Sequence, residues 1–201
     1  KFSDADGAPV LPEVTGEIEK GIERLQAGGW EWTGSPDNAL VETVDIRDEY
    51  LADLRNKTDL EKIRKSGIRI GCDPLHGAGA GYLDHLLETE GMQPFVLHAE
   101  RDVYFGGDHP EPANLAELRQ AMLDQQLTLG LGTDGDTDRF GMLDDNGDFF
   151  YPNEILALLL DYLVETRGWK GAVARTVATT HLIDRVADLN NLEVLETPVG
   201  F

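Results

Sequence analysis

The hydrophobic positions near the start of the chain recur at helical spacing. Apolar residues at positions 14, 18, 22 and 25 predict an amphipathic helix over residues 13–26, which a Gly-Gly pair then ends. Gly, Ser, Pro and Asn dominate residues 33–38, so this stretch is predicted to be a linker that separates two domains. Residues 46–66 are charged and helical in character.

From residue 68 onward, short apolar runs alternate with helical patterns, which is typical of an α/β fold. Four strands are predicted, at residues 68–72, 94–98, 127–131 and 140–143. Two helices are predicted among them, at residues 77–91 and at 114–126, the second with Asn114 as its N-cap. The pattern then restarts as helix, strand, helix and strand, at residues 153–167, 172–177, 180–190 and 192–196.

The strongest chemical signal is the run Gly-Thr-Asp-Gly-Asp-Thr-Asp-Arg between the third and fourth predicted strands. It places Asp134, Asp136 and Asp138 within five residues. Carboxylates this close repel one another unless a cation lies between them, and oxygen ligands favour Mg²⁺ or Ca²⁺. An extended strand would hold the ligands too far apart, so the loop must curl, and Gly135 gives the backbone that freedom. Arg139, which follows at once, is suited to bind a phosphate.

Three other interpretations of this loop compete with that one. The plain structural alternative is a solvated acidic hairpin loop. An EF-hand fits poorly because Arg139 occupies the position of its glycine and Asp145 that of its final glutamate. A haloacid-dehalogenase-type phosphatase fits poorly because Asp138 stands where that motif has Thr or Val.

Two further loops carry polar residues whose role the sequence leaves open. Residues 73–81 contain His76 and several small residues, which suit either a phosphate site or tight packing of a strand on a helix. His76 could equally anchor this loop or act in catalysis. Residues 105–112 hold His109 and Glu111 among prolines, which suits either the wall of a site or a structural loop.

Charge and cysteine content exclude several classes of protein. The formal net charge of −21, from 38 Asp and Glu against 17 Lys and Arg, argues against nucleic acid or an anionic membrane as a partner. The single cysteine, Cys72, rules out an intrachain disulfide, so a reducing, cytoplasmic location is expected. The longest apolar run, residues 155–160, is too short to span a bilayer.

Taken together, these motifs resemble the α-D-phosphohexomutase family, which includes phosphoglucomutase and phosphomannomutase. Residues 134–139 resemble its metal loop, Asp-Gly-Asp-x-Asp-Arg. Other matching segments occur in the order of the family, at residues 1–2, 6–9, 76–77, 109–112, 174–187 and 197–201. The resemblance covers essentially the whole chain.

This resemblance implies a fold and a division into domains. The family has four domains, and its first three share a mixed α/β topology, so we expect a mixed sheet sandwiched by helices with partial domains on either side. Residues 1–38 would end domain 1, residues 39–150 would form a complete metal-binding domain 2, and residues 151–201 would begin domain 3. The chain is therefore expected to be an internal piece of a longer protein, inactive by itself because the phosphoserine loop lies outside it.

The resemblance also implies a mechanism, in which a phosphoserine exchanges a phosphoryl group with a hexose monophosphate through a bisphosphate. The cofactor Mg²⁺ would be held by three aspartates, Asp134, Asp136 and Asp138. Arg139 and Lys1 would be catalytic residues beside the phosphoserine. Asp138, Arg139 and Thr197 would contact the substrate, a glucose or mannose phosphate. The alternative is a non-catalytic Mg²⁺- or Ca²⁺-binding α/β module, and the substrate sugar and the oligomeric state stay open.

Overall fold

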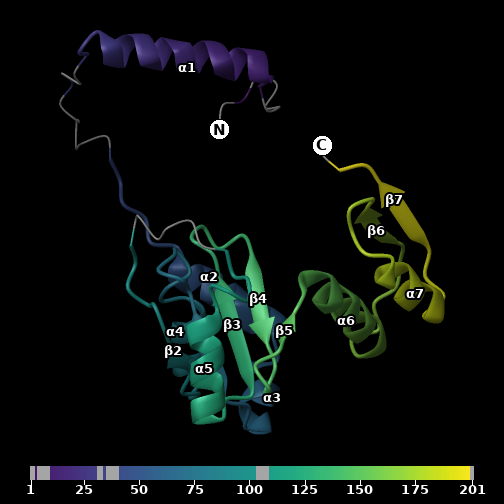
Figure 1. The fold of residues 1–201 in the computed structure, drawn as a ribbon. Coiled ribbons are helices and arrows are strands. Elements are labelled where there is room, and N and C mark those ends of the chain that lie inside the picture. Colours follow the sequence, from purple (N-terminus) through teal and green to yellow (C-terminus); the bar gives the residue numbers. More distant parts are fainter. Residues whose placement is uncertain (1–2, 4–9, 31–33, 35–40, 103–108, 200–201) are drawn as a thin grey trace. The chain divides into compact units, whose positions relative to one another are not determined.

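The computed structural model describes residues 3, 10–30, 34, 41–102 and 109–199 of the 201-residue chain. The chain divides into two compact units, residues 1–45 and residues 46–201. The predicted N-terminal helix is confirmed as α1 (Pro12–Ala27), which has Pro at its first position and Gly28 as its C-cap (Figure 1). None of the residues of α1 is buried, and Val14, Ile22 and Leu25 of its apolar stripe are exposed.

The charged stretch that opens the second unit forms two helices, α2 (Arg47–Lys57) and α3 (Leu60–Ser66). They are separate because Asp59 caps the second, its carboxylate accepting the backbone N–H of Lys62 at 3.0 Å. Gly67 then ends α3 in the left-handed conformation that glycine adopts without strain.

A mixed five-stranded sheet forms the centre of this unit, in the order β2-β1-β3-β4-β5 (Figure 1). The strands β1 and β3 are parallel to each other, as are β1 and β2, whereas β4 is antiparallel to both β3 and β5. Their bounds are β1 (Ile70–Asp73), β2 (Phe95–Val96), β3 (Leu129–Thr133), β4 (Phe140–Leu143) and β5 (Phe149–Phe150). The predicted mixed α/β fold is therefore confirmed, although β5 was not predicted.

Helices cover both faces of the sheet. Successive side chains of a strand point to opposite faces, so the apolar residues of one strand pack against helices on either side. The helix α5 (Ala116–Gln125) packs on the face where β1 and β3 present glycines, and its Leu118 and Met122 are fully buried. On the other face Cys72 and Ile70 pack with Leu87 of α4 (Leu83–Thr89).

Two predicted helix starts are wrong. The helix expected over residues 77–91 begins only at Leu83, because Gly81 lies in the left-handed region at φ 81°, which a helix cannot include. Asn114 is not the N-cap of α5: the cap is Leu115, and the Asn114 amide instead donates to the carbonyl of His109 at 2.9 Å.

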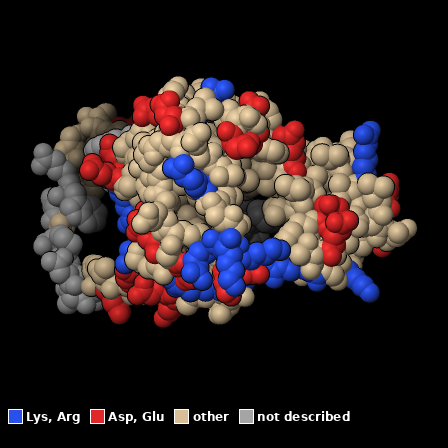
Figure 2. Space-filling view, turned by 90° about the horizontal axis from the view of Figure 1, so that it is seen from below, with Lys and Arg blue, Asp and Glu red and all other residues tan. Residues whose placement is uncertain are grey.

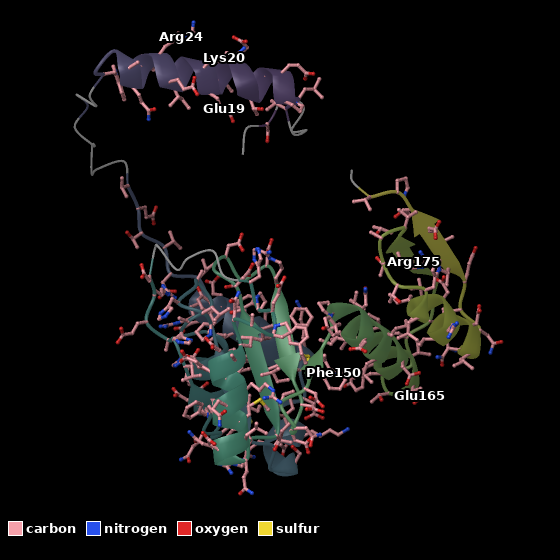
Figure 3. The ribbon with its side chains drawn as sticks, in the orientation of Figure 1. Glu19, Lys20, Arg24, Phe150, Glu165 and Arg175 are labelled. Atoms are coloured by element: carbon pink, nitrogen blue, oxygen red, sulfur yellow. The ribbon has the colours of Figure 1, made fainter. Side chains whose placement is uncertain are left out.

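The remaining predicted elements are confirmed as α6 (Pro152–Glu165), β6 (Val173–Thr176), α7 (Leu182–Leu189) and β7 (Val194–Thr197). The strands β6 and β7 pair in parallel. Arg175 of β6 is 6% exposed and turns toward α7, where Nε and Nη2 bind the two oxygens of Asp184 at 2.5 and 2.6 Å (Figure 3). Within the described part of the chain, no helix combines the length and apolar character that crossing a membrane requires.

Candidate metal centre

The acidic loop leaves β3 at its C-terminal end and turns back into β4. Two backbone hydrogen bonds close it, from the N–H of Thr137 to the carbonyl of Asp134 (3.1 Å) and from the N–H of Asp134 to the carbonyl of Arg139 (3.3 Å). The predicted curl is therefore present. Its left-handed residue is Thr137, at φ 63°.

The curl brings the three predicted ligands together. One carboxylate oxygen from each of Asp134, Asp136 and Asp138 lies within 4.8 Å of the others, so the cluster could hold a metal ion. Asp134 is buried at 1% exposure, whereas Asp136 and Asp138 are exposed. A donor set made only of carboxylate oxygens suits a hard divalent cation better than a thiophilic one, so the residues present fit the expected kind of ion.

Arg139 is hydrogen-bonded to Asp134, the buried member of this cluster. Its backbone N–H donates to one oxygen of Asp134 at 3.1 Å and its Nε donates to the other at 2.6 Å. Burial alone would raise the pKa of Asp134, but these hydrogen bonds and the guanidinium charge lower that pKa below its ordinary value. Asp134 therefore stays ionised, and each of its oxygens keeps a lone pair for a cation.

The loop at residues 109–112 lies beside the acidic loop and forms a wall of the same site. His109 Nε2 lies 3.2 Å from Nη1 of Arg139, which can donate to it. Both loops line a cavity of about 620 Å³ with three aromatic side chains, Phe140, Phe149 and Tyr151. The sequence did not single out these aromatics, since nothing in their spacing sets them apart from core residues. Residues 105–108 of the predicted wall lie outside the described residues.

The glycine-rich loop after β1 packs directly on the acidic loop. A Cβ at Gly77 would come within 2.6 Å of the Asp134 carbonyl and 2.8 Å of the Gly135 Cα, both of them backbone atoms. The N–H of Ala78 donates to the Gly135 carbonyl at 2.8 Å. His76 anchors this loop, because its Nδ1 lies 2.9 Å from the carbonyl of Glu100. Tight packing is thus the interpretation of these glycines that the structure supports.

Two other residues were predicted to belong to the site, Lys1 and Thr197. Lys1 lies outside the described residues. Thr197 is the last residue of β7, where its carbonyl accepts the N–H of Val177 at 2.9 Å and its hydroxyl lies 3.4 Å from the carbonyl of Arg175.

Basic side chains gather at the opposite end of the sheet. In the view from below, from the end at which α3 lies, Lys and Arg form a group on the surface (Figure 2). The sequence around α3 contains six of the 17 basic residues: Arg55, Lys57, Lys62, Arg64, Lys65 and Arg69. Since α3 precedes β1 and the acidic loop follows the parallel strand β3, α3 and the acidic loop lie at opposite ends of these two strands.

Comparison with known proteins identifies similar sequences. Residues 48–147 match the family profile described as phosphoglucomutase/phosphomannomutase, alpha/beta/alpha domain II, and residues 151–201 match domain III of the same family. A phosphoglucomutase/phosphomannomutase from Thermococcus kodakarensis is 32% identical over 78% of this chain and 34% of its own length. A protein from Methanopyrus kandleri described as a phosphoglucosamine mutase is 31% identical over 100% of this chain and 43% of its own length.

Solved structures show the same fold. A protein from Thermus thermophilus described as a phosphomannomutase matches with a TM-score of 0.73 and 30% identity, over 100% of this chain and 45% of its own. The Paramecium phosphoglucomutase pp63/parafusin, in its open form, matches with a TM-score of 0.66 and 27% identity, over 80% of this chain and 31% of its own. This chain therefore spans less than half the length of the proteins it matches.

Proposed function

Because the chain belongs to the phosphohexomutase family, whose matched relatives are phosphomutases, we propose that it provides the metal-binding centre of such an enzyme. The reaction is the interconversion of a hexose 1-phosphate and a hexose 6-phosphate through a phosphoserine and a bisphosphate. The observation that supports this proposal is the cluster of three carboxylates within 4.8 Å, with Arg139 bonded to its buried member.

In the proposed site the three aspartates hold Mg²⁺, which when bound would neutralise charge on the phosphoryl group in transfer. Asp134 fixes the ligand geometry because it is buried and accepts two hydrogen bonds from Arg139. Arg139, half exposed, presents its guanidinium edge to the phosphate. Asp138 and Arg139 contact the substrate from this loop, and Thr197 contacts it from the end of β7. Lys1 assists at the phosphoserine.

We place the domain limits of the proposed enzyme at residues 1–38, 39–150 and 151–201. Since the chain spans 34% and 43% of the two curated relatives named above, we infer that catalysis needs parts of the enzyme outside it. The 201-residue chain is thus expected to show no conversion of glucose, mannose or glucosamine 1-phosphate, measured with added hexose 1,6-bisphosphate. Measurable turnover by the pure chain would contradict this division of the enzyme.

Calorimetric titration with Mg²⁺ tests the metal site directly. The chain is expected to bind one ion, more weakly than submicromolar because the phosphoserine oxygen is not among its ligands. The double variant Asp136→Asn, Asp138→Asn should weaken binding at least about tenfold, since two of three charged ligands are lost. Asp145→Asn, in the exposed acidic turn after β4, is the matched control and should bind as the unmodified chain does. Equal affinity in all three proteins would exclude the site.

A further inference from the structure

The sheet contains a buried carboxylate that the metal cluster does not use. Asp73 ends β1 and is 1% exposed, and it pairs across the sheet with Gly132, two residues before Asp134. One of its oxygens accepts the N–H of Leu75 at 2.9 Å and lies 2.9 Å from Nδ1 of His98. A buried carboxylate is costly unless it is hydrogen-bonded, so these two contacts account for its presence at a buried position.

His98 connects this carboxylate to the glycine-rich loop. Because the Asp73 carboxylate can only accept, Nδ1 of His98 carries the proton of their hydrogen bond. The backbone carbonyl of His98 accepts the N–H of His76 at 3.1 Å, and the two imidazole rings lie 4.7 Å apart. His98 follows β2 in sequence, so one side chain joins the loops that leave two neighbouring strands.

The backbone around this pair is strained at three positions. Leu75, His76 and His98 have φ values of 45°, 60° and 45°, in the left-handed region that non-glycine residues rarely adopt. Such residues persist only where the surroundings fix them. Here Asp73 binds the backbone of Leu75 and the side chain of His98, so it holds two of the three strained residues in place.

The strained turn is the surface against which the acidic loop rests. A Cβ added at Gly77 would come within 2.6 to 2.9 Å of backbone atoms of Asp134 and Gly135, and the N–H of Ala78 donates to the Gly135 carbonyl at 2.8 Å. The acidic loop at Asp134 and Gly135 therefore packs on a turn whose shape depends on Asp73 and His98. Neither of these two residues lies among the carboxylate ligands.

We propose that Asp73 and His98 are positioning residues for the metal loop, acting through the turn at residues 74–78. The inference rests on the proposed metal site, because it assigns these residues to the geometry of that site. It predicts that loss of the His98 donor releases the turn, loosens the loop and lowers affinity for the metal, without unfolding the sheet.

The test compares His98→Ala with His98→Asn in the chain. Asn retains an N–H donor and tolerates the left-handed backbone, so it should preserve the contact that Ala removes. His85→Ala, on α4, is the matched control for loss of an imidazole. Mg²⁺ affinity should fall about tenfold in His98→Ala, recover most of this loss in His98→Asn and stay unchanged in His85→Ala.

Amide hydrogen exchange provides a second readout that does not need the metal. The Ala78 N–H should exchange faster in His98→Ala, whereas amides within α5 keep their protection. Asp73→Asn, which keeps the shape of the side chain, should speed the same amide and serves if His98→Ala does not fold. Unchanged Ala78 exchange and unchanged affinity in folded His98→Ala would overturn this inference. Failure of the unmodified chain to bind Mg²⁺ would instead contradict the proposed function.

Discussion

At the scale of single residues, Gly77 is the position where the two loops come closest. Its φ is not in the left-handed region, so alanine could adopt its backbone conformation, but the added Cβ would meet three backbone atoms between 2.6 and 2.9 Å away. Backbone atoms cannot swing aside as a flexible side chain can. The absence of a side chain at this position is therefore a steric requirement.

Gly77→Ala is expected to destabilise the chain by about 2 kcal/mol, the usual cost of overpacking, and to weaken Mg²⁺ binding because it displaces the acidic loop. Urea unfolding and calorimetry measure the two effects. Gly21→Ala, in the middle of α1 with nothing within 4 Å of the added methyl, should be neutral or slightly stabilising. A Gly77→Ala protein as stable as the unmodified chain would show that the two loops separate without cost.

The site residues differ in how far the sequence could predict them. The three ligands and Arg139 lie within six consecutive positions, so local charge repulsion alone indicated a cation. Asp73 and His98 are 25 positions apart and meet only because β1 and β2 are neighbours in the sheet. Nothing in the sequence indicated that Thr137 is the left-handed residue of the loop, because the hydrogen bonds that close the loop, and not its residue type, fix that conformation.

At the scale of elements, α5 lies close to the sheet because β3 presents glycines to it. A Cβ at Gly132 would come within 2.5 Å of Leu115, and one at Gly130 within 2.5 Å of the sulfur of Met122. The helix side chains fill this space and are completely buried. The packing of β3, the strand that leads into the acidic loop, therefore depends on contacts between large side chains at α5 and glycines of β3.

Leu118→Ala should lower the free energy of unfolding by about 3 kcal/mol, because a fully buried leucine leaves a cavity on truncation. Leu123, on the same helix and 42% exposed, provides the matched control. Leu123→Ala should change stability by less than about 0.5 kcal/mol. Equal losses for the two variants in urea unfolding would contradict the arrangement of α5 described above.

The β6–α7 turn should give the stability of the chain a particular dependence on pH. Hydrogen bonds from Arg175, and then from His181, lower the pKa of Asp184 well below its ordinary value and outweigh its partial burial. A carboxyl with a lowered folded-state pKa stabilises the fold above its unfolded pKa, about 3.9, and this contribution is lost as the pH falls through the folded value.

Asp184→Asn should therefore be less stable than the unmodified chain at pH 7, and the difference should shrink as the pH falls below about 4. Thermal unfolding of both proteins across this range measures the difference. Asp188→Asn, at an exposed position of the same helix, should show no such trend. A stability difference that stays constant between pH 7 and pH 3 would show that the Arg175 contact does not depend on ionised Asp184.

Element type was predicted well and element ends less well. Strands β1, β3 and β4 followed from apolar runs, since strands buried by helices on both faces read as continuous hydrophobic segments. The false start of α4 arose because apolar spacing after Gly77 fits a helix, whereas the contacts of that segment with the acidic loop fix it in turns. The two-residue strand β5 is too short for any periodicity to reveal.

At the scale of the whole molecule, the excess of acidic residues opposes folding through long-range repulsion. With a net charge of −21, added salt should stabilise the chain, because the screening length falls from about 30 Å at 0.01 M to about 10 Å at 0.1 M. A simple rise in the thermal midpoint on adding MgCl₂ would therefore not demonstrate a metal site. The measurement has to compare MgCl₂ with NaCl at equal ionic strength.

Under that condition the unmodified chain should gain stability from Mg²⁺ beyond the gain from NaCl, by about 2.7 kcal/mol when the ion is at 100 times its dissociation constant. The Asp136→Asn, Asp138→Asn variant removes two charges from the loop, so its repulsion is smaller and its starting midpoint should be slightly higher. At the same ion concentration its extra gain from Mg²⁺ should fall to about 1.4 kcal/mol or less, because binding is at least about tenfold weaker whereas screening remains. The same extra gain from Mg²⁺ in both proteins would mean that the ion acts on the diffuse negative surface, and the acidic loop would then be an ordinary solvated turn.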